Sequence, residues 1–168
     1  NVREIGRSRL ERAGKKAIPA VSQLLNHSNE FIQGRAIWLL GKLGPDGLKI
    51  VESQLENQNP KIRVCAFRAL RHENHRMLEH AGKLAKDSSP LVRREVALAM
   101  RYVPFEKARE ILLEIAKRYD GQDRYYVEAF GIGCTDKEEK IYSVLKKRNY
   151  NRIISENAKN ISLLYSIW

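Results

Sequence analysis

The sequence has no long hydrophobic run, since no apolar stretch approaches the roughly 20 residues that a membrane-spanning helix needs. It is also poor in cysteine, because Cys65 and Cys134 are the only two among its 168 residues. Their wide separation excludes a Cys-x-x-Cys redox pair and a zinc site of closely spaced ligands. No segment is enriched in glycine, serine or proline, as a flexible linker would be. We therefore expect one domain over residues 1–168, with both cysteines as small buried residues.

The sequence motifs of common catalytic and cofactor sites are absent as well. There is no glycine-rich phosphate loop after a strand, no nucleophile elbow, and no arrangement of Ser or Cys with His and a carboxylate that spacing alone would bring together. His72, His75 and His80 lie close in sequence, but spacings of three and five do not keep all three on one helical face. We predict no enzymatic activity, no cofactor and no metal site.

The net charge of +11 invites a nucleic-acid interpretation, but the excess of basic residues is concentrated at the two ends. Residues 1–16 carry a net charge of +4, from six basic and two acidic side chains. Residues 137–168 also carry +4, from seven basic and three acidic side chains, which leaves +3 for the 120 residues between them. A duplex-binding groove would be basic along its length, because its affinity comes from neutralising successive phosphates. The charge pattern therefore favours a solvated surface over a DNA groove.

A period of thirty residues organises the chain. One large apolar residue returns five times at this interval, and a second series starts with Val2. The first series is Leu10, Leu40, Leu70, Met100 and Phe130, and the second is Val2, Ile32, Ile62 and Val92. Such a period is typical of stacked supersecondary units, none of which can bury its apolar face alone.

Within each period, two stretches of helical spacing flank a polar turn. The expected helix pairs are 17–25 with 30–43, 48–55 with 61–71, 78–85 with 91–102, and 104–115 with 124–132. Residues 1–14 match the second helix of a pair, and residues 136–148 match a first helix. We expect Gly44-Pro45 to end the helix before it. Arg124 falls one position late relative to Arg63 and Arg93, which predicts a remodelled turn. The apolar residues beyond Asn149, including 161–168, suggest a further unit that is cut short.

The stretch Ile62-Arg63-Val64-Cys65-Ala66-Phe67-Arg68-Ala69-Leu70 resembles the inner helix of a HEAT repeat, in which an arginine follows an apolar residue and a run of Ala and Leu continues. The resemblance covers nearly the whole chain. It implies an all-α, right-handed α-solenoid of about five HEAT-like helical hairpins. In this arrangement we expect Arg63 and Arg93 to be structural, bonding the turns between helices or neighbouring acidic groups.

A narrower resemblance involves residues 119–133, from Tyr119-Asp120-Gly121 to Gly131-Ile132-Gly133, and the segment Ser162-Leu163-Leu164-Tyr165-Ser166-Ile167-Trp168. Both look like the HEAT region of large bacterial proteins that combine a sugar-dehydrogenase-like propeller with a haem-binding Cys-x-x-Cys-His domain. This chain contains neither of those parts, so their chemistry does not carry over. The resemblance implies a periplasmic or exported parent protein. The opening Asn-Val-Arg-Glu has no start methionine and no signal-peptide pattern, so we expect an excised piece of a longer chain.

Residues that face away from the core of the inner helices are the candidate binding surface. If 62, 66, 69 and 70 face the core, then 64, 68 and 71 lie opposite, and steps of thirty extend this stripe along the chain. The stripe comprises Gly34, Trp38 and Gly41, then Val64, Arg68 and Arg71, then Arg94, Leu98 and Arg101, and then Glu128 and Gly131. Aromatic residues beside arginines are typical of binding hot spots. An indole that merely covers the neighbouring repeat explains Trp38 equally well.

From these patterns we expect a non-enzymatic protein-interaction or scaffolding module of a larger protein. It would dock a partner or a neighbouring domain of the same polypeptide on its concave face. The candidate partner-binding residues are Trp38, Arg68, Arg71, Arg94, Leu98 and Arg101. The alternative is a nucleic-acid-binding module similar to the HEAT-like DNA glycosylases, which are also small, basic and wholly helical. A continuous positive face and strongly salt-dependent DNA binding would distinguish this alternative.

Overall fold

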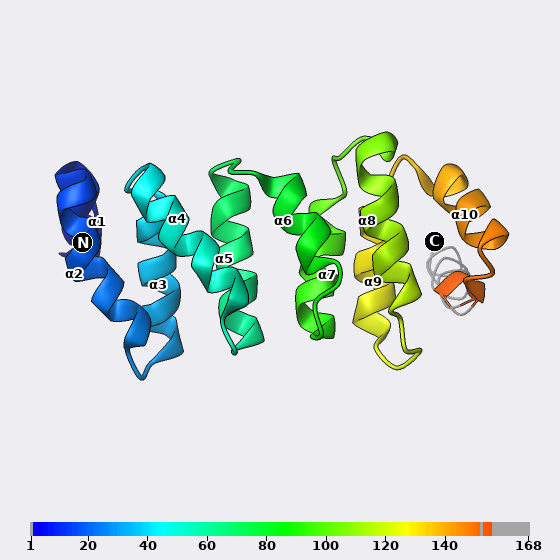
Figure 1. Cartoon of the computed structure of the whole chain (residues 1–168), viewed down its shortest axis with the longest axis horizontal. Coiled ribbons are helices and arrows are strands. Elements are labelled where there is room, and N and C mark those ends of the chain that lie inside the picture. Colours follow the sequence, from blue (N-terminus) through cyan, green and yellow to red (C-terminus); the bar gives the residue numbers. More distant parts are fainter. Residues whose placement is uncertain (1, 152, 156–168) are drawn as a thin grey trace. The chain divides into compact units, whose positions relative to one another are not determined.

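The protein is all-helical. The computed structural model describes residues 2–151 and 153–155, with the backbone alone for residues 2 and 3. This part of the chain contains ten α-helices and three short 3-10 helices, with no β-strand, which confirms the predicted all-α class. None of the described helices combines the length and the hydrophobicity that crossing a bilayer requires. The described helices, labelled in Figure 1, belong to two compact units that divide between Met77 and Leu78.

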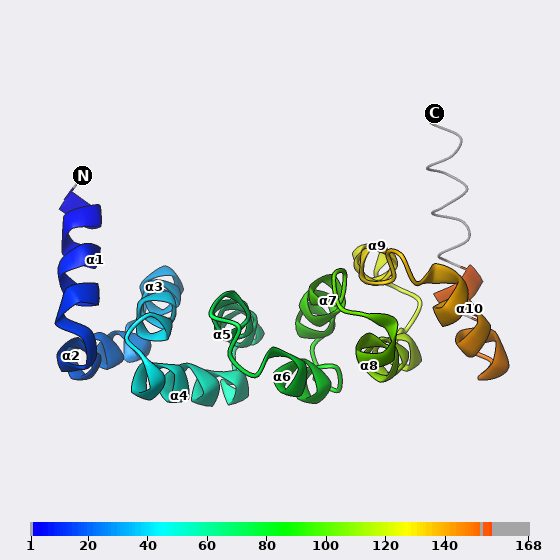
Figure 2. The same ribbon diagram turned by 90° about the horizontal axis from the view of Figure 1, so that it is seen from above.

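The first unit is built around the packing of α3 against α5, with α2 and α4 lying against them in a second row (Figure 2). Its elements are α1 (Val2–Ala13), η1 (Gly14–Ala17), α2 (Ile18–Gln23), η2 (Leu24–Asn26), α3 (Glu30–Gly41), α4 (Pro45–Ser53), η3 (Gln54–Glu56) and α5 (Pro60–His72). Ile37, Leu40 and Leu70 are fully buried in the core between these helices. Two members of the predicted thirty-residue series, Leu40 and Leu70, therefore occupy equivalent buried places.

The second unit repeats this plan, with α7 packed against α9 and α8 packed against both of them. Its elements are α6 (Met77–Leu84), which begins at the boundary between the units, α7 (Pro90–Ala99), α8 (Phe105–Lys117), α9 (Arg124–Gly133) and α10 (Glu138–Lys147), which contacts α8. Met100 and Phe130, the next members of the series, are also buried. The thirty-residue spacing thus correctly predicts two core positions in each unit: Leu40 and Leu70 in the first, and Met100 and Phe130 in the second.

The turns inside the helix pairs share one hydrogen-bond arrangement. In the turn before α5, the Asn57 side chain accepts a hydrogen bond from the Asn59 amide, and the Asn59 side chain accepts one from the Lys61 amide. Such Asx interactions satisfy amide groups that the first turn of a helix leaves free. Arg63 is buried, and its guanidinium donates to the carbonyl oxygens of Asn57 and Gln58 at 2.8 and 3.1 Å.

The same arrangement returns thirty residues earlier and thirty residues later. Arg93 donates to the carbonyls of Asp87 and Ser88 at 2.7 and 3.0 Å, as Arg63 does in its own turn. Before α3, Gln33 stands at the equivalent position, and its side-chain amide donates to the His27 carbonyl at 2.6 Å. The prediction that Arg63 and Arg93 are structural is confirmed. The same role of Gln33 did not emerge from the sequence.

Arg93 makes further contacts that link its turn to the next helix pair. Its Nε donates to the hydroxyl of Tyr126 on α9 at 3.0 Å, and its second amino group donates to the Arg118 carbonyl at 3.3 Å. The Tyr126 hydroxyl in turn donates to the Ile115 carbonyl on α8 at 2.7 Å. Because a buried guanidinium needs hydrogen-bond acceptors, this network ties α7 to both α8 and α9.

The turn before α9 is remodelled, as the late Arg124 predicted. Asp123 begins α9, and its carboxylate accepts from the Tyr125 amide. Arg124 points into solvent and pairs with Glu128 at 2.8 Å, so it does not bind the turn carbonyls as Arg63 and Arg93 do. The extra residue in this turn displaces the arginine from the place where it would reach those carbonyls.

Three details of the sequence interpretation were wrong. Gly44 and Pro45 do not end α3, which finishes at Gly41; Pro45 is the first residue of α4 instead, where its missing N–H has no cost. Leu10 is 37 % exposed, so it does not share the buried role of Leu40 and Leu70. Val64, placed on the solvent side by the stripe, is buried, because α5 is covered on more of its circumference than a single apolar face. The segment 161–168 lies outside the described residues.

Two glycines mark places where helices approach closely. A Cβ atom at Gly47 on α4 would overlap the Leu40 carbonyl of α3, and one at Gly133 on α9 would overlap the Ala97 carbonyl of α7. In both cases the obstacle is backbone, which cannot move aside as a flexible side chain would. Glycine therefore sets the spacing of one helix pair in each unit.

Replacing Leu70 by alanine should lower the free energy of unfolding by about 2–5 kcal/mol, because it leaves a cavity in the core of the first unit. Leu10→Ala is the matched control. Since Leu10 is 37 % exposed, the same change there should alter stability by less than about 1 kcal/mol. Urea unfolding of both variants checks this, and equal losses would mean that both leucines are buried to the same degree.

Arg93→Ala should destabilise the protein by about 3–5 kcal/mol, because it removes the donor for three backbone carbonyls and for the Tyr126 hydroxyl. Arg109→Ala, which removes an exposed arginine paired with Glu110, should change stability by no more than about 0.5 kcal/mol. Thermal unfolding of the two variants side by side measures the difference. Similar melting temperatures would contradict the structural role of Arg93.

Candidate functional site

The predicted site residues fall in both units, and each unit contributes its own patch. The first patch comprises Trp38 on α3 with Arg68 and Arg71 on α5. Trp38 is 37 % exposed and Arg68 is also exposed, whereas Arg71 is half-buried. Trp38 packs edge-on against the ring of His72, with ring centroids 5.5 Å apart. The indole is therefore held in place by α5 while part of it still faces solvent.

Cys65 interacts with both Trp38 and Arg68 of this first patch. Burial raises the pKa of the Cys65 thiol, and the charge of Arg68 and a hydrogen bond with Trp38 oppose part of that rise. The Cys65 sulfur also lies 3.7 Å from the Gly34 carbonyl of α3. A Cβ atom at Gly34 would lie 3.5 Å from the sulfur, which is an ordinary van der Waals contact, so α3 approaches Cys65 closely without excluding a small side chain here. The structure thus brings Trp38 and Arg68 together around Cys65.

The second patch lies on α7 and the residues that follow it, and comprises Arg94, Leu98 and Arg101. Arg94 and Leu98 are half-buried and Arg101 is exposed. Arg94 pairs with Asp123 at 3.3 Å and lies over the ring of Tyr125, 5.8 Å from its centroid. Arg101 lies 5.2 Å from the ring centroid of Tyr102. Each arginine of the second patch is thus paired with an aromatic ring.

Three aromatic residues in these patches escaped the sequence interpretation. Tyr125 and Tyr102 are strongly exposed, at 67 % and 85 %, and His72 contacts Trp38. Each of them lies outside the stripe defined by steps of three and four along the inner helices. Two positions could have signalled them: Tyr102 directly follows Arg101, and Tyr125 lies about one thirty-residue period after Arg94. Together with the arginines they give each patch the composition of a binding hot spot.

Neither cysteine has the environment of a catalytic nucleophile. A reactive cysteine has a lowered pKa, which keeps part of the thiol ionised at neutral pH. Burial raises the pKa of the Cys134 thiol to about 12, and the nearby charge of Lys137 opposes only part of that rise. Burial also raises the pKa of the Tyr126 hydroxyl, which is engaged by Arg93 and the Ile115 carbonyl. These groups stay protonated and belong to the core.

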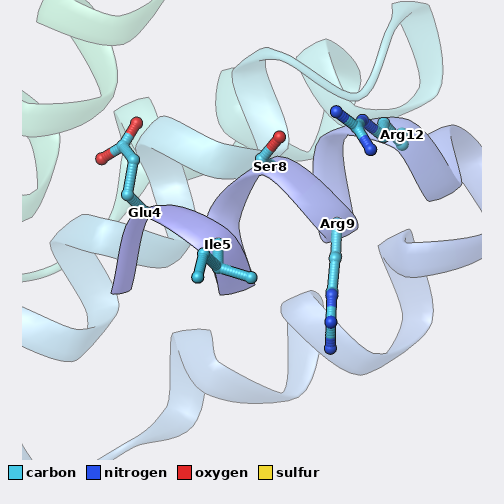
Figure 3. Close-up of a pocket in the computed structure, with 5 residues that line it drawn as sticks. All are labelled: Glu4, Ile5, Ser8, Arg9 and Arg12. Atoms are coloured by element: carbon cyan, nitrogen blue, oxygen red, sulfur yellow. The ribbon is translucent and has the colours of Figure 1, made fainter. Parts of the chain in front are cut away.

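A hollow of about 400 Å³ runs along α1, and its lining offers no convergent set of chemical groups (Figure 3). All five lining residues come from this one helix: Glu4, Ile5, Ser8, Arg9 and Arg12. In the close-up, Glu4 and Ser8 extend from one side of the ribbon and Arg9 from the other. Side chains that diverge in this way do not surround a substrate.

Comparisons with known proteins give no relative: no protein-family model, no curated protein and no solved structure matches the chain. The function must therefore be argued from the patches and their chemistry.

Cys134 should resist alkylation in the folded protein, because its thiol is buried and almost wholly protonated at pH 8. Iodoacetamide at pH 8, followed by mass spectrometry, should label Cys65 slowly and Cys134 only in the presence of denaturant. Rapid labelling of Cys134 without denaturant would contradict its buried placement.

The same thiol makes stability depend on pH in a defined direction. Below about pH 8.5 both the folded and the unfolded thiol carry the proton, so Cys134 adds no pH dependence. Above it the unfolded thiol ionises while the folded one, with a pKa of about 12, does not, so stability falls as pH rises. Between pH 7.5 and 9.5 the wild type should lose about 1 kcal/mol more than Cys134→Ala in urea unfolding. An identical loss would contradict the raised pKa.

Proposed function

We propose that this chain is a HEAT-like α-solenoid of about five helical hairpins that acts as a non-enzymatic protein-interaction or scaffolding module. It docks a protein partner, or a neighbouring domain of the same polypeptide, through its two patches. The resemblance to the HEAT region of large exported bacterial proteins supports a connecting role within such a parent protein. The recurring turn, in which Gln33, Arg63 and Arg93 bind backbone carbonyls thirty residues apart, supports the repeat assignment.

One observation carries the binding role: Trp38 keeps 37 % of its surface exposed although its ring is fixed by contact with His72. A rigid, partly exposed indole offers a large apolar contact at a small cost in side-chain entropy. Arg68 stands beside it as a cation, and the second patch has the same pairing of Arg94 with Tyr125. Tryptophan, tyrosine and arginine are the residues most enriched at the energetic centres of protein interfaces.

The chemical groups that the two patches present support a binding function. Both thiols have raised pKa values, and the patches present guanidinium groups and aromatic rings. Such groups recognise carboxylates and apolar side chains, and they do not abstract protons at neutral pH. An acidic or aromatic-rich partner fits them best.

The alternative is a nucleic-acid-binding module, which the net charge of +11 favours. Against it, Arg94 is paired with Asp123, and Arg124 of the same unit is paired with Glu128. Arginines neutralised by carboxylates release fewer counterions from DNA phosphates and contribute less to affinity.

The charge-reversal variant Arg94→Glu with Arg101→Glu should abolish retention of the protein partner, because like charges would then meet an acidic surface. Quantitative mass spectrometry of proteins retained on immobilised wild type and variant measures this. Trp38→Ala should weaken the retention without changing its dependence on salt, since it removes apolar area and no charge. The melting temperature of each variant controls for folding, because Arg94 also pairs with Asp123.

A short DNA duplex titrated in parallel separates the two functions. We expect no binding at physiological salt. Tight binding that is lost in the Arg94→Glu, Arg101→Glu variant would favour the nucleic-acid alternative. If neither proteins nor DNA respond to these substitutions, the patches are solvated surface and the module is a spacer between domains.

A further inference from the structure

An apolar groove of about 510 Å³ lies between α1 and α3 in the first unit, apart from most of the predicted site residues. Seven residues line it: Glu4, Arg7 and Leu10 from α1, Arg35, Trp38 and Leu39 from α3, and Lys42, which directly follows α3. Volumes of this size are typical of sites that enclose several side chains or a small ligand. Of the predicted site residues, only Trp38 belongs to this lining.

The floor of the groove is apolar and is fixed on one side. Leu10 and Trp38 are each 37 % exposed, and Leu39 is partly buried against the core. The His72 ring holds Trp38 from the side of α5. Because this wall is already ordered, a partner that inserts an apolar side chain does not have to order it.

The rim of the groove is basic. Arg35 and Lys42 stand at the two ends of the α3 wall, and both are exposed. In the part of the chain that the structure describes, neither forms an ion pair with an acidic side chain. Arg7 on α1 is already paired with Glu11 at 2.8 Å. Two available cations thus flank Trp38 and Leu39, one on α3 and one directly after it.

The spacing of these cations defines a complementary ligand. Arg35 and Lys42 are seven residues apart, which is two helical turns or about 10 Å along the axis. Trp38 and Leu39 lie between them at the third and fourth positions after Arg35. A second helix laid along α3 would match them with carboxylates seven residues apart and large apolar residues three and four positions after the first carboxylate.

We propose that this groove binds an acidic amphipathic helix of a partner protein, with its apolar residues against Leu10, Trp38 and Leu39 and its carboxylates against Arg35 and Lys42. This inference rests on the proposed interaction function, whose partner class it specifies. Glu4 stands at the α1 side of the groove and disfavours a carboxylate there. The helix therefore binds with its acidic residues toward α3.

The probe is a synthetic amphipathic peptide of about 18 residues with two glutamates seven positions apart and Phe-Leu at the third and fourth positions after the first. Its twin carries lysines in place of both glutamates. Trp168, the other tryptophan in the sequence, is replaced by phenylalanine so that fluorescence reports on Trp38 alone. The acidic peptide should shift Trp38 emission to the blue and bind at least tenfold more tightly than the lysine twin. The difference should shrink as salt is raised.

Arg35→Glu with Lys42→Glu should weaken binding of the acidic peptide at least tenfold and should favour the lysine twin instead. Leu10→Asp should also weaken the acidic peptide at least tenfold, because it places a carboxylate in the apolar floor. Arg9→Glu is the matched control: it reverses an exposed charge on α1 outside the groove and should leave the affinity unchanged. Circular dichroism melts of every variant confirm folding, and all four positions that are changed to acids are exposed.

Three outcomes would overturn the groove proposal. The first is equal binding of the acidic and lysine peptides, and the second is unchanged affinity in the Arg35→Glu, Lys42→Glu variant. The third is a concentration-dependent dimer that Leu10→Asp abolishes, because a second copy of the chain would then occupy the groove. If the acidic peptide does not bind but proteins are still retained through Arg94 and Arg101, the groove proposal is refuted and the proposed function stands. If the peptide binds but no protein is retained through Arg94 and Arg101, the groove proposal stands and docking through the second patch is refuted.

Discussion

The architecture depends on one interaction, the donation of hydrogen bonds by a buried side chain to the carbonyls of the preceding turn. Arg63 and Arg93 each donate to two consecutive carbonyls, and Gln33 donates to one. The turns expose their carbonyls because both flanking helices end there, and a buried carbonyl without a donor is costly. The side chain that satisfies them therefore fixes the turn against the start of α3, α5 or α7. This holds within each unit.

The arginines of the inner helices differ in burial, and this determines which of them contribute to the surface. On α5 and α7 one arginine faces inward to the turn and another faces outward: Arg63 is buried and Arg68 is exposed, while Arg93 is buried and Arg94 is half-buried. Sequence composition alone treats all these guanidinium groups as one basic surface. The structure separates the guanidinium groups that bind turn carbonyls from those that face solvent, so the net charge overstates the number of exposed cations.

The fold could be predicted further than the site. The thirty-residue spacing identified the buried Leu40, Leu70, Met100 and Phe130, since periodic apolar residues report directly on burial. The spacing failed at Leu10, which is exposed. A repeat position shows which residue faces toward a neighbouring helix, but it does not show whether that helix packs closely enough to bury it. The structural role of Gln33 was missed because its neutral amide donates to a turn carbonyl as Arg63 does, but the two side chains do not resemble each other in sequence or charge. Tyr125 and the groove beside Trp38 depend on distances between helices, which no local pattern encodes.

The turn before α9 is bonded differently from the turns before α5 and α7, and this affects where the chain can accept an added residue. In the turns before α5 and α7 a guanidinium holds two successive carbonyls, so an added residue would break those bonds. In the turn at 119–123 the equivalent arginine, Arg124, pairs with Glu128 instead, and Asp123 caps α9 through a local contact with the Tyr125 amide. Its glycine at 121 adopts a positive φ of 87°. An added residue at Gly121 or Gln122, both exposed, would therefore break no pair of carbonyl bonds of the kind that Arg63 and Arg93 make, so this turn should tolerate insertions better than the turns before α5 and α7.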